Sequence, residues 1–164
     1  PIIEDEFIDS NLSLKDYIYE IVKSFEEISN KEFIINIDEF ENLIKTYKSP
    51  EIIYGLRNFI GNANKFSNKK IEIILKSNKK DTEIIIRDDG PGFPADLIDK
   101  HRLGEPYIRT KDSTHTSKYG LGLGTFIGKT LLEKNLATIS FKNFNKNNSA
   151  EVIIKWKNKE LARL

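Results

Sequence analysis

Three short stretches rich in asparagine, aspartate and glycine constrain this chain most. In chain order they are residues 58–67 (NFIGNANKFS), 88–93 (DDGPGF) and 120–124 (GLGLG), with tens of residues between them. The first supplies amides, the second a carboxylate, and the third glycines that let a ligand approach the backbone closely. A fold that brings the three stretches together offers one pocket with all three kinds of group.

The overall composition indicates a single domain with an ordinary hydrophobic core. The chain has 164 residues, 38% of them hydrophobic, and a formal net charge of +1. That length suits one domain better than two, and that charge gives no electrostatic reason to expect a nucleic acid as partner. The chain has no cysteine and no apolar run of membrane-helix length, so we expect a cytoplasmic domain.

Hydrophobic spacing predicts three helices. The first is capped by Asn11 or Ser13 and runs to Ile28, with Leu14, Ile18, Ile21, Val22, Phe25 and Ile28 on its buried face. The second starts at Ser49-Pro50-Glu51, which offers a capping hydroxyl and a proline in the first turn, and ends near Phe66. The third covers 121–135, with a buried face of Leu123, Phe126, Ile127, Thr130, Leu131 and Leu132.

Alternating apolar residues predict the strands 33–37, 43–47, 71–76, 82–87, 137–142 and 150–156. We expect the first two to be neighbours and the strands 71–76 and 82–87 to form a hairpin. The second strand of that hairpin leads directly into Asp88 and a Gly-Pro-Gly turn. The polar segment from about 103 to 119 shows little periodicity, which in a compact domain favours a functional loop.

Asn58 and Asn62 lie one helical turn apart, so they share a face of the predicted helix over 50–66. An amide oxygen suits Mg²⁺, which prefers oxygen ligands and takes further contacts from substrate phosphates. Lys65, one turn further on, is placed to pair with a phosphate. The alternative is that these asparagines simply face solvent on an amphipathic helix.

Asp88 stands where a strand ends, a good place for a carboxylate to accept a hydrogen bond from an exocyclic amine such as adenine N6. Guanine presents a carbonyl at that position instead. Asp-Asp-Gly is also an ordinary turn sequence, so this motif by itself leaves both interpretations open.

The glycines Gly120, Gly122 and Gly124 lie at the start of the third predicted helix. There they let backbone amides and the positive helix end face a phosphate. A dinucleotide-binding fingerprint is excluded because the glycines follow a polar segment rather than a strand and have the wrong spacing. A P-loop is excluded because Gly128-Lys129-Thr130 has Leu123, not the required glycine, five positions before Gly128.

In combination the three stretches resemble the N, G1 and G2 boxes of the GHKL ATPase superfamily, and most closely the catalytic and ATP-binding domain of sensor histidine kinases. Residues 12–25 and 33–37 are similar to the helix and strand with which such domains begin. The segment 103–107 (LGEPY) and the run 120–135 are similar to the RegB/PrrB subgroup of redox-responsive kinases.

The resemblance implies an α/β (α+β) two-layer sandwich of the Bergerat type, with a mixed, mainly antiparallel sheet, helices on one face and an ATP lid. It implies a domain over 11–158, a connector over 1–10 from an upstream dimerisation and phosphoacceptor hairpin, and a C-terminal tail over 159–164. The implied ligands are ATP and Mg²⁺. The implied partners are the hairpin, as a homodimer in the intact protein, and the receiver domain of a response regulator.

The resemblance also assigns site residues. Asn62 binds Mg²⁺, Asn58 assists it, Lys65 approaches the phosphates, Phe66 borders the adenine and Asp88 recognises the base; Asn58, Asn62 and Lys65 are the catalytic set. The remaining ATP-binding candidates are Gly90, Gly92, Tyr107, Arg109, Lys111, Gly120, Leu121, Gly122, Leu123 and Gly124.

The chain departs from the family pattern at several positions. Gly104 stands at the first aromatic position of the box before the lid, Thr125 replaces the usual leucine after the last glycine, and Leu136-Ala137 stand where a glycine pair is common. The first residue of the N box is Asn58 rather than glutamate. Since an amide cannot take a proton from water, an ATP-hydrolysing chaperone or topoisomerase is disfavoured.

The resemblance implies a kinase domain that transfers the γ-phosphoryl of Mg-ATP to a histidine outside this chain. Neither His101 nor His115 is followed by the acidic residue expected of an acceptor. We expect the intact protein to have a membrane anchor upstream, as is common in the family. The alternative is a nucleotide-binding regulatory module of the same fold that has lost transfer activity.

Overall fold

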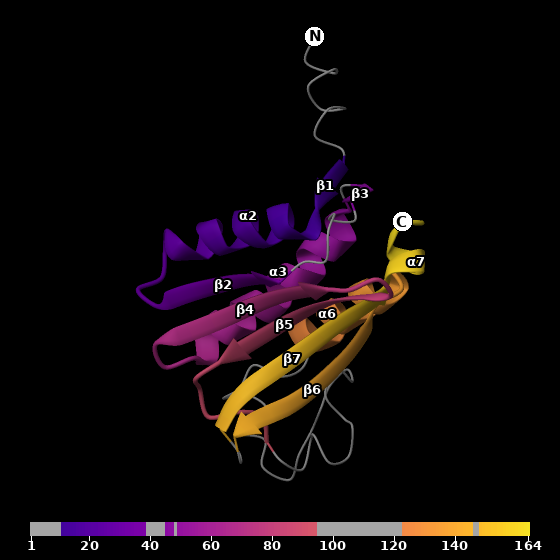
Figure 1. The fold of residues 1–164 in the computed structure, drawn as a ribbon. Helices are drawn as coiled ribbons and strands as arrows, with labels where there is room; N and C mark the ends of the chain where they lie inside the picture. The colour runs from indigo at the N-terminus through magenta and orange to yellow at the C-terminus, as the bar shows by residue number, and fades with distance from the viewer. Residues whose placement is uncertain (1–10, 39–44, 48, 95–122, 146–147) are drawn as a thin grey trace.

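The computed structural model describes residues 11–38, 45–47, 49–94, 123–145 and 148–164. A five-stranded sheet of order β2-β4-β5-β7-β6 forms one layer, and the helices α2, α3 and α6 form a second layer on one side of it (Figure 1). The strands of this sheet are β2 (Glu32–Asp38), β4 (Lys70–Ser77), β5 (Asp81–Asp88), β7 (Asn148–Lys157) and β6 (Thr138–Asn145). The helices are α2 (Leu14–Glu26), α3 (Pro50–Phe66) and α6 (Leu123–Lys134).

The sheet is mixed and mainly antiparallel, as predicted. β2 runs parallel to β4, and the pairs β4–β5, β5–β7 and β7–β6 are all antiparallel. The register aligns one apolar row across all five strands, made of Ile35, Ile73, Ile86, Val152 and Phe141. This row faces the helices, because all five residues belong to the hydrophobic core or pack against it. The predicted α/β sandwich is therefore confirmed.

The expected pairing of strands 33–37 and 43–47 is wrong. β3 (Lys45–Tyr47) pairs with β1 (Asn11–Ser13) in a separate two-stranded sheet, whereas β2 pairs with β4. β2 has four apolar residues, all half-buried, and completes the large sheet, whereas β3 is only three residues long. A strand this short forms few ladder hydrogen bonds, so its own residues do not determine which strand it pairs with.

α2 begins at the predicted cap. The Ser13 side chain and the backbone amide of Asp16 form one half of a capping box, and the Asp16 carboxylate accepts from the Ser13 amide at 3.0 Å. Leu14, Ile18, Ile21 and Val22 are buried as expected. Ile28 is 81% exposed, so its assignment to the buried face is wrong, because the helix ends at Glu26 and the chain then turns away.

α6 presents a different face to the core from the one predicted. Leu132 is buried as expected, but Ile127 is 39% exposed and Thr130 is exposed, whereas Thr125 and Gly128 are buried. The reason is close packing against α3: a Cβ on Gly128 would lie 3.2 Å from the Phe59 ring, and one on Gly55 would lie 2.6 Å from Leu132 Cγ. Small residues set this interface, and hydrophobicity alone does not reveal them.

The C-terminal residues pack onto the domain. The segment 159–164, expected as a tail, lies largely in α7 (Asn158–Leu161) and the turn after it; Leu161 is fully buried and Leu164 packs against the core. Trp156 of β7 is also fully buried, and its indole Nε1 donates to the backbone oxygen of Asn135 at 2.9 Å. Within the described residues, no helix has both the length and the apolar character needed to cross a membrane.

Candidate nucleotide-binding site

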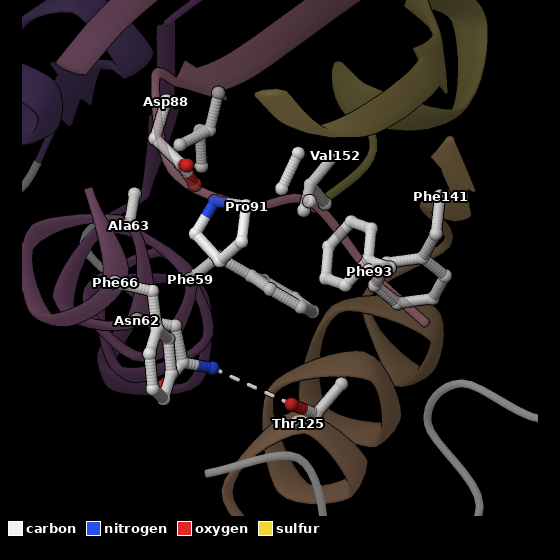
Figure 2. A pocket seen from close by; sticks show the side chains of 13 residues that line it. Phe59, Asn62, Ala63, Phe66, Asp88, Pro91, Phe93, Thr125, Phe141 and Val152 are labelled. Carbon is white, nitrogen blue, oxygen red and sulfur yellow. Dashed lines mark hydrogen bonds between the residues drawn. The ribbon is translucent and has the colours of Figure 1, made fainter. Parts of the chain in front are cut away.

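A pocket opens where the C-terminal half of α3 meets the end of β5 (Figure 2). α6 closes one side of it, and the segment after β5 together with β6 and β7 forms the opposite wall. Its lining consists of Phe59, Asn62, Ala63, Phe66, Ile86, Asp88, Pro91, Gly92, Phe93, Thr125, Phe141, Ala150 and Val152. Most of these side chains are apolar, and three polar ones, Asn62, Asp88 and Thr125, converge on the same space.

Asp88 is the buried acid of this pocket. It continues the inward-facing positions of β5, after Ile84 and Ile86, and is 8% exposed. Its Oδ1 accepts the backbone amide of Gly90 at 2.8 Å, which orients the carboxyl group. Burial raises the pKa of Asp88 to about 6, with a further contribution from the neighbouring Asp89. Such a carboxylate gains most from a ligand that donates a hydrogen bond to it.

The turn after β5 depends on its glycines. A Cβ on Gly90 would lie 2.3 Å from the backbone oxygen of Phe66 and 2.8 Å from Asp88 Oδ1, so only glycine lets the turn pass between α3 and Asp88. Gly92 has a φ of 82°, a conformation in which other residues are strained. Both predicted glycines therefore shape the pocket wall.

Asp89 holds this turn to the loop after α3. Its carboxylate accepts the backbone amides of Asn68 at 2.8 Å, Lys69 at 3.1 Å and Lys70 at 3.2 Å. Burial acts to raise the pKa of Asp89, but these hydrogen bonds outweigh it and the pKa is lowered. The two adjacent acids thus have separate tasks: Asp89 fixes the loop, and Asp88 faces the pocket.

The aromatic wall of the pocket is also fixed by hydrogen bonds. Asn143 of β6 accepts the backbone amide of Phe93 at 2.7 Å and donates to its backbone oxygen at 2.9 Å. The Phe93 ring meets Phe141 edge-on with centroids 5.7 Å apart, and Phe141 lies 5.9 Å from Phe59. This cluster gives the pocket a rigid apolar side.

On the α3 side, Asn62 and Phe66 point into the pocket one helical turn apart (Figure 2). The Asn62 amide nitrogen donates to the Thr125 hydroxyl of α6 at 3.4 Å. Lys65 is exposed, and its ammonium lies 5.2 Å from the Phe66 ring centroid. An exposed cation therefore stands over the aromatic ring of Phe66 at the pocket.

The structure thus brings Asn62, Phe66, Asp88 and Gly92 together in one lining, with Gly90 directly behind it. Asn58 lies beside Gly128 of α6 and outside the lining, and Gly124 is exposed in the first turn of α6. Leu123 begins α6. The candidates Tyr107, Arg109, Lys111, Gly120, Leu121 and Gly122 lie outside the described residues.

Sequence reasoning missed the far wall, formed by Phe93, Phe141, Ala150 and Val152, and the role of Thr125. Phe141 and Val152 follow the alternation of their strands, so they were recognisable as core residues. Nothing in the sequence indicated that this part of the core is open to a ligand.

The donor set fits a magnesium ion that is shared with a substrate. The described residues contain no cluster of three or more His, Cys, Asp or Glu side chains that would hold a metal by themselves. They do offer the amide group of Asn62 next to the pocket. Mg²⁺ commonly takes one or two protein ligands and completes its shell with water and phosphate oxygens, which matches this sparse arrangement.

Comparison with known proteins decides the family. The model described as "Histidine kinase-, DNA gyrase B-, and HSP90-like ATPase" matches residues 48–159. The chain belongs to this family. ATP is therefore the nucleotide for which such a pocket is built, and the predicted family membership is confirmed.

Curated relatives place this ATPase-family domain among the sensor histidine kinases. Sensor histidine kinase RegB of Cereibacter sphaeroides is 40% identical over 101 residues, which covers 58% of this chain and 21% of RegB. Histidine protein kinase SaeS of Staphylococcus aureus is 39% identical over 89 residues, covering 52% of this chain and 25% of SaeS. The chain thus spans about a fifth to a quarter of the length of these relatives, and the RegB-like relationship is confirmed.

Solved structures show the same fold. The mycobacterial sensor histidine kinase MprB superposes with a TM-score of 0.72 at 18% identity, over 90% of this chain and 97% of that one. The catalytic domain of histidine kinase ThkA superposes with a TM-score of 0.69 at 20% identity, over 91% of this chain and 96% of that one. The domain accordingly has the fold of histidine kinase catalytic domains.

Proposed function

We propose that this domain binds Mg-ATP in the pocket between α3, α6 and the end of β5, and delivers the γ-phosphoryl group to a histidine. That histidine belongs to an upstream helical hairpin through which the intact protein dimerises. A response-regulator aspartate then takes the phosphoryl group in a separate step. The intact protein is held at a membrane by an anchor upstream of a cytoplasmic catalytic domain.

One observation carries the nucleotide part of this proposal: Asp88 and Asn62 line the same pocket although they come from different layers of the fold. Asp88 offers a buried carboxylate to the exocyclic amine of adenine, and Phe66, Phe93 and Val152 offer apolar surface to the ring. Guanine presents a carbonyl where adenine presents the amine, so a carboxylate there disfavours GTP.

The phosphates belong on the Asn62 side of the pocket. Asn62 is the residue that would hold Mg²⁺. The side chain of Lys65 is exposed, so it can turn from its position over the Phe66 ring toward a phosphate. When bound, Mg²⁺ neutralises charge on the phosphate oxygens. The protein's task is then positioning, since phosphoryl transfer needs little covalent chemistry from the enzyme.

The position of Asn58 supports transfer to another residue over hydrolysis by this domain. A hydrolytic member of the family needs a base that takes a proton from water, and an amide is not such a base. Asn58 moreover lies against Gly128, with its Cβ 3.3 Å from the point where a Gly128 Cβ would stand. The group that accepts the phosphoryl must therefore come from elsewhere.

Phosphorylation of the intact protein tests the proposal. The chain joined to its upstream hairpin is incubated with γ-labelled ATP and Mg²⁺, and the label is tested for the acid lability and base stability of phosphohistidine. We expect label on the hairpin, none on the isolated chain, and loss of label in Asp88→Asn. ATP binding without labelling in the joined protein would instead support the transfer-inactive regulatory module.

A further inference from the structure

The hydroxyl group of Thr125 meets the amide of Asn62 at the edge of the pocket (Figure 2). Thr125 is 1% exposed, so it is one of the few buried polar side chains among the described residues. Its Oγ1 accepts a hydrogen bond from Asn62 Nδ2 at 3.4 Å. A buried hydroxyl in such a place needs a polar partner, and Asn62 provides it.

The packing of the two helices fixes this contact. α3 and α6 run side by side with four successive points of contact: Glu51 with Lys134 at 3.3 Å, Gly55 with Leu132, Phe59 with Gly128, and Asn62 with Thr125. At the two middle points the glycines let the helices pack closely, because a Cβ on Gly55 or Gly128 would crowd Leu132 or Phe59. The last of the four contacts is a hydrogen bond between side chains, and it lies at the pocket.

An amide group has two chemically different ends, and a metal ion accepts only one of them. Mg²⁺ binds the amide oxygen, whereas the amide nitrogen is a donor and repels a cation. When Thr125 holds the nitrogen of Asn62, the amide cannot rotate, and its oxygen is directed away from Thr125 within the amide plane. Without an acceptor at position 125, the amide is free to rotate and present its nitrogen to the cation.

We propose that Thr125 is a positioning residue that orients the Asn62 amide so that its oxygen faces the nucleotide-bound Mg²⁺. This rests on the proposed function, because it takes Asn62 as the magnesium ligand. Although Thr125 lines the pocket, this role requires no contact of its own with the nucleotide or the ion. It acts through Asn62, and it links the start of α6 to the amide on α3.

The test compares nucleotide affinity with and without Mg²⁺, measured by calorimetry with a non-hydrolysable ATP analogue. Thr125→Val keeps the shape of the side chain and removes the acceptor. Because one hydrogen bond of this kind contributes on the order of 1 kcal/mol, we expect the gain in affinity from Mg²⁺ to fall by about threefold to tenfold. Affinity measured in EDTA should stay within about twofold of the wild type.

Two variants serve as controls. Thr125→Ser keeps the hydroxyl and should retain the full gain from Mg²⁺. Thr130→Val makes the same substitution at an exposed position of the same helix and should behave as the wild type. If Thr125→Val does not fold, as judged by its thermal melting, Thr125→Ala and Thr125→Ser make the comparison, with loss expected for the first and retention for the second.

The outcomes separate this proposal from the one on which it rests. An unchanged gain from Mg²⁺ in Thr125→Val, or an equal loss in Thr125→Val and Thr125→Ser, overturns the role of the hydroxyl while nucleotide binding stands. A wild-type chain that binds the analogue equally well with and without Mg²⁺ overturns both the metal role of Asn62 and the role of Thr125. A wild-type chain that binds no nucleotide overturns the proposed function itself.

Discussion

Asp88 and Asp89 are adjacent in the chain, yet their surroundings shift the pKa values of their carboxyl groups in opposite directions. Burial raises the pKa of Asp88 to about 6, whereas hydrogen bonds from the amides of the 68–70 loop lower the pKa of Asp89 despite its partial burial. The difference arises because strand alternation turns Asp88 into the pocket and lets Asp89 reach back to the end of α3. Asp88 thus stays available to a ligand, whereas Asp89 stabilises the turn by its hydrogen bonds to the 68–70 loop.

The raised pKa of Asp88 predicts that ATP affinity falls as the pH drops through about 6. The charged carboxylate accepts a hydrogen bond from the adenine amine, and protonation turns one of its oxygens into a donor. Calorimetric titrations between about pH 5 and 8 should show affinity rising with pH and levelling above about 7. In the same range Asp88→Asn should bind weakly at every pH; an affinity of the wild type that does not change over this range would contradict the assignment.

Asp88→Asn should stabilise the nucleotide-free domain at neutral pH. Because the pKa of folded Asp88 is raised, the folded state holds its proton more tightly than the unfolded state does, so stability falls as the pH rises from about 4 to about 6 and stays lower above that. The rise in pKa corresponds to about 2–3 kcal/mol. Asparagine keeps an acceptor for the Gly90 amide and carries no charge, so urea unfolding at pH 7 should show a gain of that order.

The neighbouring position provides the matched control for that gain. Asp89→Asn weakens three hydrogen bonds to a charged acceptor and should lower the free energy of unfolding by about 1–3 kcal/mol at pH 7. Asp88→Asn should converge toward the wild type below about pH 4, whereas Asp89→Asn should do so only at lower pH, because the pKa of folded Asp89 is lowered. Equal losses in both would show that Asp88 is a structural residue rather than one held ready for a ligand.

Gly90→Ala should damage both stability and nucleotide binding. The added Cβ would stand 2.3 Å from the Phe66 backbone oxygen, so α3 or the turn has to shift, at a cost of about 1–3 kcal/mol. Gly124→Ala is the control for the stability measurement, because a Cβ at that position would have no atom within 4 Å. Its thermal midpoint should match or exceed that of the wild type, and a loss as large as that of Gly90→Ala would refute the steric argument.

Leu136→Gly should stabilise the domain. The two hydrogen bonds Leu136 N to Glu133 O and Ala137 N to Leu132 O, both 3.0 Å, close the end of α6, and Leu136 has a φ of 70°. Glycine is favoured at such a helix end because it lacks a Cβ. Since Leu136 is 42% exposed, little burial is lost, and we expect a gain of about 1 kcal/mol in urea unfolding. Leu136→Ala keeps the unfavourable φ and should show no gain.

Local signals in the sequence predicted much of the fold. The capping hydroxyl of Ser49 and the proline after it define the start of α3, and the turn at Asn78 closes the β4–β5 hairpin where expected. Both features are decided by neighbouring residues. The pairing of β3 with β1 is decided by distant parts of the chain, and propensity carries no information about it.

The site was predictable to the extent that its residues sit in motifs. Asn62, Phe66, Asp88 and Gly92 meet in the pocket, as their resemblance to the family boxes implied. The buried face of α6 was mispredicted because close packing selects Gly128 and a hydrogen bond selects Thr125, and neither residue is hydrophobic. Asn58 belongs to the same box, yet it packs against Gly128 of α6. It shares a helix face with Asn62 but lies one turn further from the pocket along α3.

The central claim is that the pocket binds adenine nucleotides through Asp88. Calorimetry on the wild-type chain and Asp88→Asn tests it most directly, with non-hydrolysable analogues of ATP and GTP in the presence of Mg²⁺. A hydrogen bond to a charged acceptor contributes about 1.5–3 kcal/mol. We therefore predict binding of the ATP analogue by the wild type, at least tenfold weaker binding by Asp88→Asn, and little binding of the GTP analogue. Equal affinity of the two proteins for the ATP analogue, or of the wild type for the two analogues, would contradict the account.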